Sequence, residues 1–287
     1  MDIIIEGQGC EQLLEGIHFS NVWVKDNAIR VRHVNLEDKA VSEFMEKATQ
    51  SNFEVNTVAD DLSIKSFGLL ALDMDSTLIE LECIDDIAAQ YGVGEEVARM
   101  TEIAMQGHMP FATYLRDRVK LFAGASADFI DVTVSHAKFI PGAHELINFA
   151  KANGLHCYIL SGGFSDIAKD VCKRLGMDGF LCNQLVVKDG IITGEVTGPG
   201  GGEILDADGK RRALEMLSML HGIDRSQAIC GGDGANDLEM IKVAGIGFAF
   251  HGKPLVAKTA KYRINNRLSV IQITTKQFHL FVYEICC

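Results

Sequence analysis

The stretch LLALDMDSTLI, residues 69–79, begins as an apolar run and then turns polar at Asp73 and Asp75. A short apolar run of this kind is typical of a parallel strand that is covered on both faces of a sheet. A buried carboxylate without a partner is strongly unfavourable. A strand that ends in two aspartates therefore requires positive charge beside them, such as a metal ion and a lysine.

The chain from residue 67 onward alternates between strand and helix patterns. Further buried strands are predicted at residues 157–160, 228–230 and 246–250, and helices between them at residues 142–152, 166–175 and 211–220. This alternation predicts an α/β fold with a doubly wound, Rossmann-like parallel sheet. A hairpin with the turn Asp189-Gly190 is expected to interrupt this strand and helix alternation of the α/β domain, with strands at residues 180–188 and 191–196.

Two segments lie outside this α/β core, which we assign to residues 67–79 and 139–287. Residues 80–138 contain helical patterns and no strand pattern, which predicts a helical cap inserted after the first strand. Such a cap would cover the carboxyl edge of the sheet, where ligands bind in open α/β folds. Residues 1–66 read as strand, helix, strand, strand, helix, strand, and predict a small separate α+β unit.

Composition excludes several classes of function. The chain has 39 acidic residues against 27 Lys and Arg, a formal charge of −12, and no basic run, so we expect no binding to nucleic acid. It has neither a signal-peptide pattern nor an apolar stretch of about 18 residues, so we expect a cytoplasmic protein without a membrane partner. Its eight cysteines include no C-x-x-C pair and are expected to be reduced, buried thiols.

Four polar clusters follow predicted strands or open predicted helices. They are Asp73 to Thr77, Ser161-Gly162-Gly163, Gly209-Lys210 and Gly231 to Asp237. Each cluster alone is ordinary, as a solvated turn, a helix cap or a surface lysine. In a parallel sheet, however, all four converge on one edge. Together they offer a carboxylate nucleophile, a second carboxyl for proton transfer, a divalent metal site and donors for a phosphate, which are the requirements of phosphoryl transfer.

The segments DMDSTLIELECIDDIA, SGGFSD and GGDGANDLEM resemble the motifs of the haloacid dehalogenase-like phosphatases. Glu82 and the stretch MQGHMPFATYLRDR make the sequence similar to the branch of that family that acts on O-phosphoserine, from about residue 67 to residue 268. The resemblance implies hydrolysis of this small-molecule substrate through an aspartyl-phosphate, with Mg²⁺, as the last step of serine biosynthesis. It also implies an N-terminal regulatory module of the ACT type for residues 1–66. A homodimer is left open.

The same resemblance implies a role for each motif residue. Asp73 would be the nucleophile and a magnesium ligand. Asp75 would be the general acid and base, with its backbone carbonyl on the metal. Asp233 would complete the metal site, and Asn236 and Asp237 would lie in or next to its ligand shell. The remaining matches are the phosphate-binding residues Ser161, Gly162 and Lys210, and the substrate-recognition residues Glu82, Met105, Phe111 and Arg118.

Physical chemistry is consistent with these roles. Magnesium prefers oxygen ligands, and a lysine and a helix start suit a phosphate dianion. Phe111 and Arg118 are seven residues apart, two helical turns, and should lie on one face of a helix. A guanidinium can bind a carboxylate with two hydrogen bonds, and Glu82 can pair with an ammonium. The predicted ligand is therefore an amino-acid phosphomonoester.

Three alternatives remain open. A related phosphomonoesterase or phosphotransferase could act on another phosphorylated amino acid or small metabolite with the same residues. A receiver-like signalling module would share the acidic pocket and the lysine, but needs neither the acid at position 75 nor a cap. A P-loop enzyme is disfavoured because six residues separate Gly202 from Gly209 and Arg211 follows Lys210.

Overall fold

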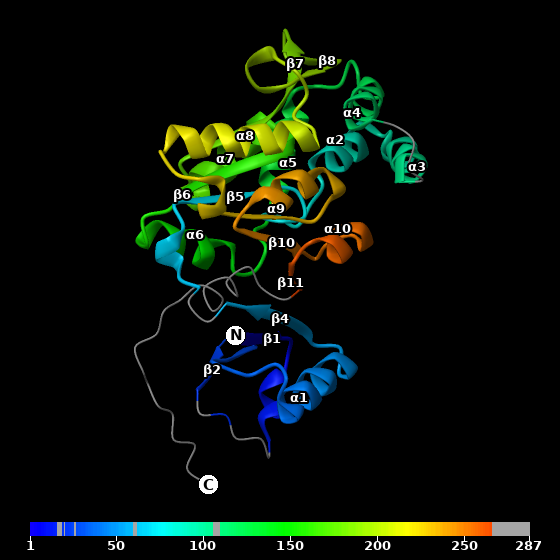
Figure 1. The fold of residues 1–287 in the computed structure, drawn as a ribbon. Helices are drawn as coiled ribbons and strands as arrows, with labels where there is room; N and C mark the ends of the chain where they lie inside the picture. The colour runs from blue at the N-terminus through cyan, green and yellow to red at the C-terminus, as the bar shows by residue number, and fades with distance from the viewer. Residues whose placement is uncertain (16–18, 20, 26, 60–61, 106–109, 266–287) are drawn as a thin grey trace.

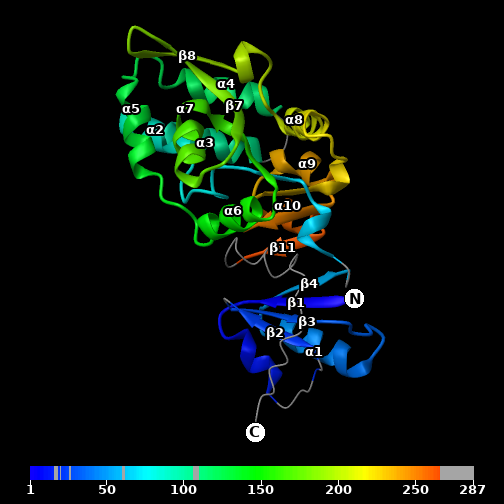
Figure 2. The ribbon, with the colours of Figure 1, turned by 90° about the vertical axis from the view of Figure 1, so that its left-hand side faces the viewer.

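The computed structural model describes residues 1–265 except 16–18, 20, 26, 60–61 and 106–109 (Figure 1). The described residues form two sheets, one of four strands and one of seven. Both views show the smaller sheet next to β11 of the larger one, with the cap helices at the far end of the molecule (Figures 1 and 2). No helix in these ranges is both long enough and apolar enough to cross a membrane.

The seven-stranded sheet has the order β11-β10-β9-β5-β6-β7-β8. Its strands are β5 (Leu69–Leu72), β6 (His156–Phe164), β7 (Gly179–Lys188), β8 (Ile191–Thr197), β9 (Ala228–Gly232), β10 (Ile246–Phe250) and β11 (Tyr262–Ile264). All neighbours are parallel except β7 and β8. The central strand β5 is fully buried, as its run of four apolar residues predicts. The predicted doubly wound α/β fold is confirmed.

Helices cover both faces of this sheet. They are α6 (Ala143–Ala152), α7 (Ser165–Leu175), α8 (Ala207–Leu220), α9 (Leu238–Val243) and α10 (Pro254–Thr259), with 3-10 turns at Ile64–Ser66, Pro199–Gly201, Arg225–Gln227 and Ala235–Asp237. Apolar side chains of α6 and α7 pack on one face, with Leu70 and Leu72 of β5. Those of α8, α9 and α10 pack on the other, with Leu69 and Ala71. Because successive side chains of β5 point to opposite faces of the sheet, this strand contributes to both core layers.

Two features of the sheet were not predicted from the sequence. The hairpin forms at the expected residues, but it also belongs to the sheet, because β7 pairs in parallel with β6 before the chain turns back into β8. The strand β11 was not predicted. It has three residues, and its parallel pairing with β10 makes it the edge of the sheet.

The cap consists of α2 (Cys83–Tyr91), α3 (Gly94–Met105), α4 (Phe111–Lys120) and α5 (Asp128–His136). It follows β5, as predicted, and is tied to the β7–β8 hairpin by backbone hydrogen bonds. The amides of Gly124 and Ala127 donate to the carbonyls of Ile192 and Gly190 at 2.9 and 2.8 Å. The amide of Ile192 donates to the carbonyl of Ala125 at 2.9 Å. The hairpin therefore connects the central sheet to the second half of the cap.

The small sheet has the order β2-β3-β1-β4 and is antiparallel, the order expected of a ferredoxin-like unit. Its elements are β1 (Asp2–Glu6), a 3-10 helix (Cys10–Leu14), β2 (Val22–Lys25), β3 (Ala28–Val31), α1 (Lys39–Gln50) and β4 (Glu54–Val58). One face packs on α1 through Ile3, Ile5 and Phe44. The predicted element order is confirmed.

The other face of the small sheet is joined to the large sheet. Ile4, Ala28 and Val58 belong to the same apolar cluster as Tyr262 and Ile264 of β11. The Asn56 side chain donates to the carbonyl of Arg263 at 2.7 Å and accepts from its amide at 2.9 Å. The Arg263 guanidinium lies 2.7 Å from Glu54 Oε1. Residues 1–58 therefore share part of their core with the α/β sheet.

Candidate active site

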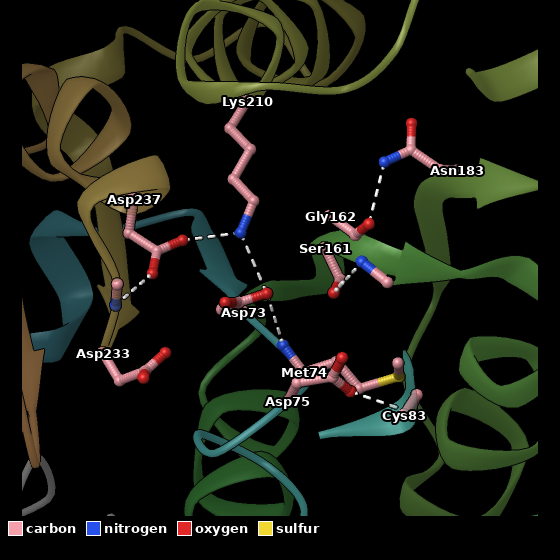
Figure 3. A network of polar contacts seen from close by, with 12 residues as sticks. Asp73, Met74, Asp75, Cys83, Ser161, Gly162, Asn183, Lys210, Asp233 and Asp237 are labelled. Carbon is pink, nitrogen blue, oxygen red and sulfur yellow. Dashed lines mark hydrogen bonds and ion pairs between the residues drawn. The ribbon is translucent and has the colours of Figure 1, made fainter. Parts of the chain in front are cut away.

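The carboxyl edge of the central sheet gathers the polar clusters predicted from the sequence (Figure 3). Asp73 and Asp75 follow β5, Ser161 lies near the end of β6, and Asp233 follows β9. Lys210 lies in the first turn of α8, which begins because Asp206 accepts a hydrogen bond from the Gly209 amide at 2.9 Å. Each functional side chain is thus placed by the end of a strand or the start of a helix.

Lys210 supplies the positive charge that the acids require. Its side chain is fully buried, and its Nζ lies 2.9 Å from Asp73 Oδ1 and 2.6 Å from Asp237 Oδ1. Burial by itself lowers the pKa of Lys210, but the ion pairs with Asp237 and Asp73 outweigh burial and raise that pKa. The ammonium is therefore charged at neutral pH and holds both carboxylates in place.

Asp73, Asp233 and Asp237 form a carboxylate cluster in which one oxygen of each residue lies within 4.8 Å of the other two. Burial and the neighbouring Asp73 carboxylate raise the pKa of Asp237 to about 8, and the same two causes raise the pKa of Asp233. Three buried acids beside two lysines, Lys210 and Lys253, carry more negative than positive charge, and their donor atoms are hard oxygens. The set fits a divalent cation, so the chain has a site for a metal ion.

The Asp75 side chain points away from this cluster, toward the cap. Its Oδ1 accepts a hydrogen bond from the thiol of Cys83 at 2.9 Å. Gly163 leaves room for the carboxyl group, because a Cβ at Gly163 would lie 2.8 Å from Asp75 Oδ2. Burial, followed by the nearby Glu82 carboxylate, raises the pKa of Asp75 well above its ordinary value. Asp75 is thus prepared to carry a proton next to Asp73.

The loop Ser161-Gly162-Gly163 is fixed by a residue that sequence reasoning missed. Asn183 of β7 is fully buried; its Nδ2 donates to the Gly162 carbonyl at 2.8 Å and its Oδ1 accepts from the Leu205 amide at 2.7 Å. Asn183 therefore connects the Ser161 loop to the segment that leads into α8 and Lys210. The signal in the sequence was a single asparagine inside the apolar run FLCNQLVV.

Ser161 is buried, and its Oγ accepts a hydrogen bond from the Gly163 amide at 3.0 Å. Asn236 approaches the same loop: a Cβ at Gly162 would lie 3.5 Å from Asn236 Nδ2 and 2.8 Å from the ring of Phe111. Phe111 is the first residue of α4, so this helix of the cap meets the Ser161 loop directly. Ser161, Gly162, Asn236 and Phe111 are therefore brought together as predicted from the sequence.

Glu82 and Arg118 lie on the side of the site that the cap forms. Glu82 precedes α2, and its Oε1 accepts a hydrogen bond from Ser76 Oγ at 2.8 Å. Burial raises the pKa of Glu82, an effect that the Lys253 ammonium opposes. Arg118 lies on α4 and is buried, with its guanidinium 3.9 Å from the centre of the Tyr114 ring. Met105 ends α3, but its side chain lies outside the described residues.

A second residue that sequence reasoning missed is Lys253. Its Nζ lies 3.1 Å from Asp233 Oδ2 and 4.0 Å from Glu82 Oε1. It follows β10 at the same sheet edge, in the sequence HGKP, and the signal in the sequence was a lysine shortly after a predicted strand. Lys253 therefore places a second positive charge between the carboxylate cluster and the cap.

Comparison with known proteins gives consistent results. The family model described as haloacid dehalogenase-like hydrolase matches residues 70–242. A phosphoserine phosphatase of Albidiferax ferrireducens is 40% identical over 210 residues, which cover 72% of this chain and 89% of that protein. One of Streptomyces coelicolor is 38% identical over 219 residues, which cover 76% of this chain and 52% of that longer protein.

Among solved structures, a phosphoserine phosphatase described as a phospho-aspartyl intermediate analogue matches with a TM-score of 0.68 and 36% identity. The match covers 73% of this chain and 99% of that one. The similarity therefore includes the fold, and the range matched by the family model contains the sheet edge from Asp73 to Asp237.

Proposed function

Because this chain belongs to the haloacid dehalogenase-like hydrolase family, we propose that it hydrolyses O-phosphoserine to serine and phosphate with Mg²⁺, in the last step of serine biosynthesis. One observation carries the proposal: two aspartates that end the same strand have opposite surroundings. Asp73 lies on the Lys210 ammonium, whereas Asp75 lies in a buried site that favours its protonated form. One is suited to attack phosphorus and the other to donate a proton.

The reaction proceeds in two displacements. In the first, an Asp73 carboxylate oxygen bonds to phosphorus, the bond between phosphorus and the serine oxygen breaks, and Asp75 gives its proton to that oxygen. In the second, Asp75 takes a proton from water, the water oxygen bonds to phosphorus, and the bond to Asp73 breaks. Phosphate leaves, and both aspartates return to their starting states. Each step therefore balances in protons without any further acid or base.

The charge of the phosphate is met by residues of two elements, α8 and β6, and by the bound ion. Lys210 provides a point charge, and the Ser161 hydroxyl with the backbone N–H of Gly162 provides hydrogen-bond donors, while the N–H of Gly163 donates to Ser161 Oγ. Asp73, Asp233 and Asp237, with the backbone carbonyl of Asp75, would hold Mg²⁺. When bound, the ion would neutralise the phosphate oxygens and the carboxylates around it. Asn236 is proposed to contact the phosphate or its bound ion.

Recognition of the amino acid is assigned to the cap, residues 80–138. Arg118 is a buried cation for the substrate carboxylate, Glu82 is an anion for its ammonium, and Phe111 closes the site over Gly162. Met105 is proposed as a further apolar contact. Each charged group of such a substrate would thus meet a residue of opposite charge: the carboxylate meets Arg118, the ammonium meets Glu82 and the phosphate meets Lys210.

The domain boundaries, the cellular location and the partners predicted from the sequence are also proposals. Residues 67–79 and 139–287 would form the catalytic core and residues 1–66 a regulatory unit. The six described cysteines that are free and buried suit a reducing compartment, and a cytoplasmic location is proposed on that basis. A small-molecule substrate is the only partner that the site itself requires, and the net charge of −12 argues against nucleic acid. A homodimer stays a prediction.

A phosphate-release assay tests the proposed function. The substrates are O-phosphoserine, O-phosphothreonine, O-phosphoethanolamine, a sugar phosphate and an aryl phosphate, each with Mg²⁺ and with a chelator. We expect O-phosphoserine to have the highest kcat/KM and the chelator to remove activity. An equal kcat/KM for all five substrates would reduce the assignment to an unspecific phosphatase, and undiminished activity in chelator would overturn the role of Mg²⁺.

A further inference from the structure

Arg118 is a buried cation without an acidic partner in the described part of the chain. Its side chain is 8% exposed, no carboxylate lies within 4.0 Å of its guanidinium, and its Nε has no hydrogen-bond partner there. Burial lowers the pKa of Arg118, while Tyr114, Asp85 and Glu82 act in the opposite direction. Leaving a buried guanidinium unpaired is unfavourable. This site is therefore built to be completed by an anion.

The group that holds the guanidinium in place is an aromatic ring. Arg118 Cζ lies 3.9 Å from the centre of the Tyr114 ring, which is the geometry of a cation–π contact. The two residues are one helical turn apart on α4, so their side chains meet on the same face. An aromatic partner stabilises the cation without using its N–H groups, which remain free to donate to a ligand.

Tyr114 brings a second polar group to the same place. Its hydroxyl is buried and has no hydrogen-bond partner among the described residues. A buried hydroxyl usually has a partner, because an unpaired one loses its hydration without compensation. Within the described ranges, α4 therefore offers two unpaired donor groups side by side, the guanidinium and the phenol.

The face of α4 that carries these groups is directed at the reaction site. Phe111 lies three residues before Tyr114, on the same helical face, and its ring lies 2.8 Å from where a Cβ of Gly162 would be. Gly162 belongs to the loop that we assign to the phosphate. A ligand whose phosphate lies at Ser161 therefore has its other end near Tyr114 and Arg118.

We propose that Tyr114 determines specificity for the carboxylate end of the substrate, its ring orienting Arg118 and its hydroxyl donating a hydrogen bond to the same carboxylate. This inference rests on the proposed function and adds to it a residue that the sequence motifs do not include. A carboxylate has enough acceptor sites for both donors, and a planar guanidinium held flat on a ring keeps two N–H groups directed at it.

The test compares two substrates that differ only at that end, O-phosphoserine and O-phosphoethanolamine, which lacks the carboxylate. For each variant, the selectivity is the ratio of kcat/KM for the two. Tyr114→Phe removes only the hydroxyl and should lower this selectivity by about 10- to 100-fold, the usual effect of one hydrogen bond to a charged group. Turnover of O-phosphoethanolamine should change by less than about threefold, because that substrate does not use the hydroxyl.

Two further variants separate the ring from the hydroxyl. Tyr114→Leu also removes the ring and should lower the selectivity by a further factor of about 2 to 30. In an Arg118→Ala background, Tyr114→Leu and Tyr114→Phe should give the same selectivity, because the ring no longer has a cation to orient. Tyr91→Phe is the matched control, since it removes a hydroxyl from the cap that donates to the Ala123 carbonyl at 3.2 Å, and it should leave the selectivity unchanged.

The outcomes distinguish this inference from the proposed function. Parallel losses on both substrates in Tyr114→Phe, or an unchanged selectivity, would overturn the role of Tyr114 while leaving the phosphoserine assignment intact. An unaltered enzyme that does not prefer O-phosphoserine would overturn both. If Tyr114→Leu does not fold, as judged by its thermal melting, Tyr114→Phe decides alone.

Discussion

Lys210 has two carboxylate neighbours, Asp73 and Asp237, and all three side chains are almost completely buried. The Asp73 side chain is therefore held on one side by the ammonium and left free on the other, toward the cation site. An amide at position 73 would keep the shape but lose both the charge and the nucleophilicity.

Asp73→Asn should consequently lower kcat by at least about 1,000-fold, a loss typical of removing a nucleophile. It should also abolish the phosphoenzyme that can be trapped with acid. The measurement is single-turnover hydrolysis of labelled O-phosphoserine. Asp189→Asn, at the tip of the hairpin, is the control, because Asp189 has a φ of 52° that asparagine adopts equally well. Activity above a few per cent in Asp73→Asn would show that another residue attacks phosphorus.

Asn183 supports the site through its hydrogen bonds to the Gly162 carbonyl and from the Leu205 amide. Asn183→Ala would leave the Gly162 carbonyl and the Leu205 amide buried without partners, which should cost about 2 to 4 kcal/mol in the free energy of unfolding. The same change should weaken phosphate binding, because the Ser161 loop loses its support. Denaturant unfolding and product inhibition by phosphate measure the two effects. Gln184→Ala, on the next and exposed residue of β7, should change neither; equal effects of the two substitutions would contradict this account.

Much of the site could be predicted at the residue scale because its motifs are local. Asp73, Ser161, Lys210 and Asp233 each follow a strand or open a helix, and parallel strands place such residues on one edge. Asn183, Lys253 and Tyr114 could not be predicted in the same way. The partners of Asn183 and Lys253 are distant in sequence, and the contact of Tyr114 with Arg118 is an i, i+4 pair of a kind found on many helices, so no short pattern connects these three residues with the chemistry.

At the scale of elements, the buried strands were predictable because each is a short apolar run, whereas the edges of the sheet were not. The pattern of β7 and β8 is that of a free hairpin, and only tertiary pairing with β6 shows that β7 belongs to the sheet. The three residues of β11 are too few to carry a periodicity. Whether a strand lies at the edge of a sheet depends on its pairing partners, and a single sequence does not show these partners.

The start of β6 and the end of α8 are joined by a pair of histidines. The rings of His156 and His221 stack at 3.6 Å, and the Tyr158 hydroxyl lies 3.0 Å from His221 Nε2. Burial and the adjacent His156 lower the pKa of His221 below its ordinary value of 6.5, an effect that Asp178 opposes. Below pH 6.5 the unfolded chain therefore takes up this proton more readily than the folded one, and folding stability falls as the pH falls.

His221→Gln should accordingly reduce the loss of thermal stability between pH 7.5 and pH 5, because glutamine does not titrate. Melting temperatures at both pH values give the measurement, with the protein otherwise unchanged. His251→Gln is the comparison, since burial also lowers the pKa of His251, without a second histidine stacked on it. A His221→Gln protein that loses as much stability in acid as the unaltered chain would show that the stack does not control this behaviour.

At the scale of the whole molecule, the N-terminal unit contributes no residue to the reaction site but is not detached from the core. Ile4, Ala28 and Val58 share an apolar cluster with Tyr262 and Ile264. The Asn56 side chain donates to the backbone carbonyl of Arg263 and accepts from its amide. β11 neighbours β10, and β10 leads into Lys253 at the site. The unit is thus separated from Lys253 by only two strands.

A protein that begins at Ser66 should still fold and retain phosphatase activity, because every residue assigned to the chemistry lies after it. Its melting temperature should fall by about 5 to 10 °C, since Tyr262 and Ile264 become exposed. Calorimetry and phosphate release measure the two properties. The full-length Asn56→Ala variant serves as an intermediate case with weakened docking. An insoluble or inactive truncated protein would mean that residues 1–58 complete the catalytic core.

The backbone hydrogen bonds between the cap and the β7–β8 hairpin have a consequence for access to Asp73. A cap that swung away as one rigid body would have to break the bonds of Gly124, Ala127 and Ile192, at about 0.5 to 1.5 kcal/mol each. Any opening motion that keeps these bonds must either carry the hairpin along with the cap or remain confined to the half of the cap that begins at α2. The hairpin therefore ties the second half of the cap to the central sheet, and access to Asp73 depends on the first half of the cap or on the hairpin moving together with the cap.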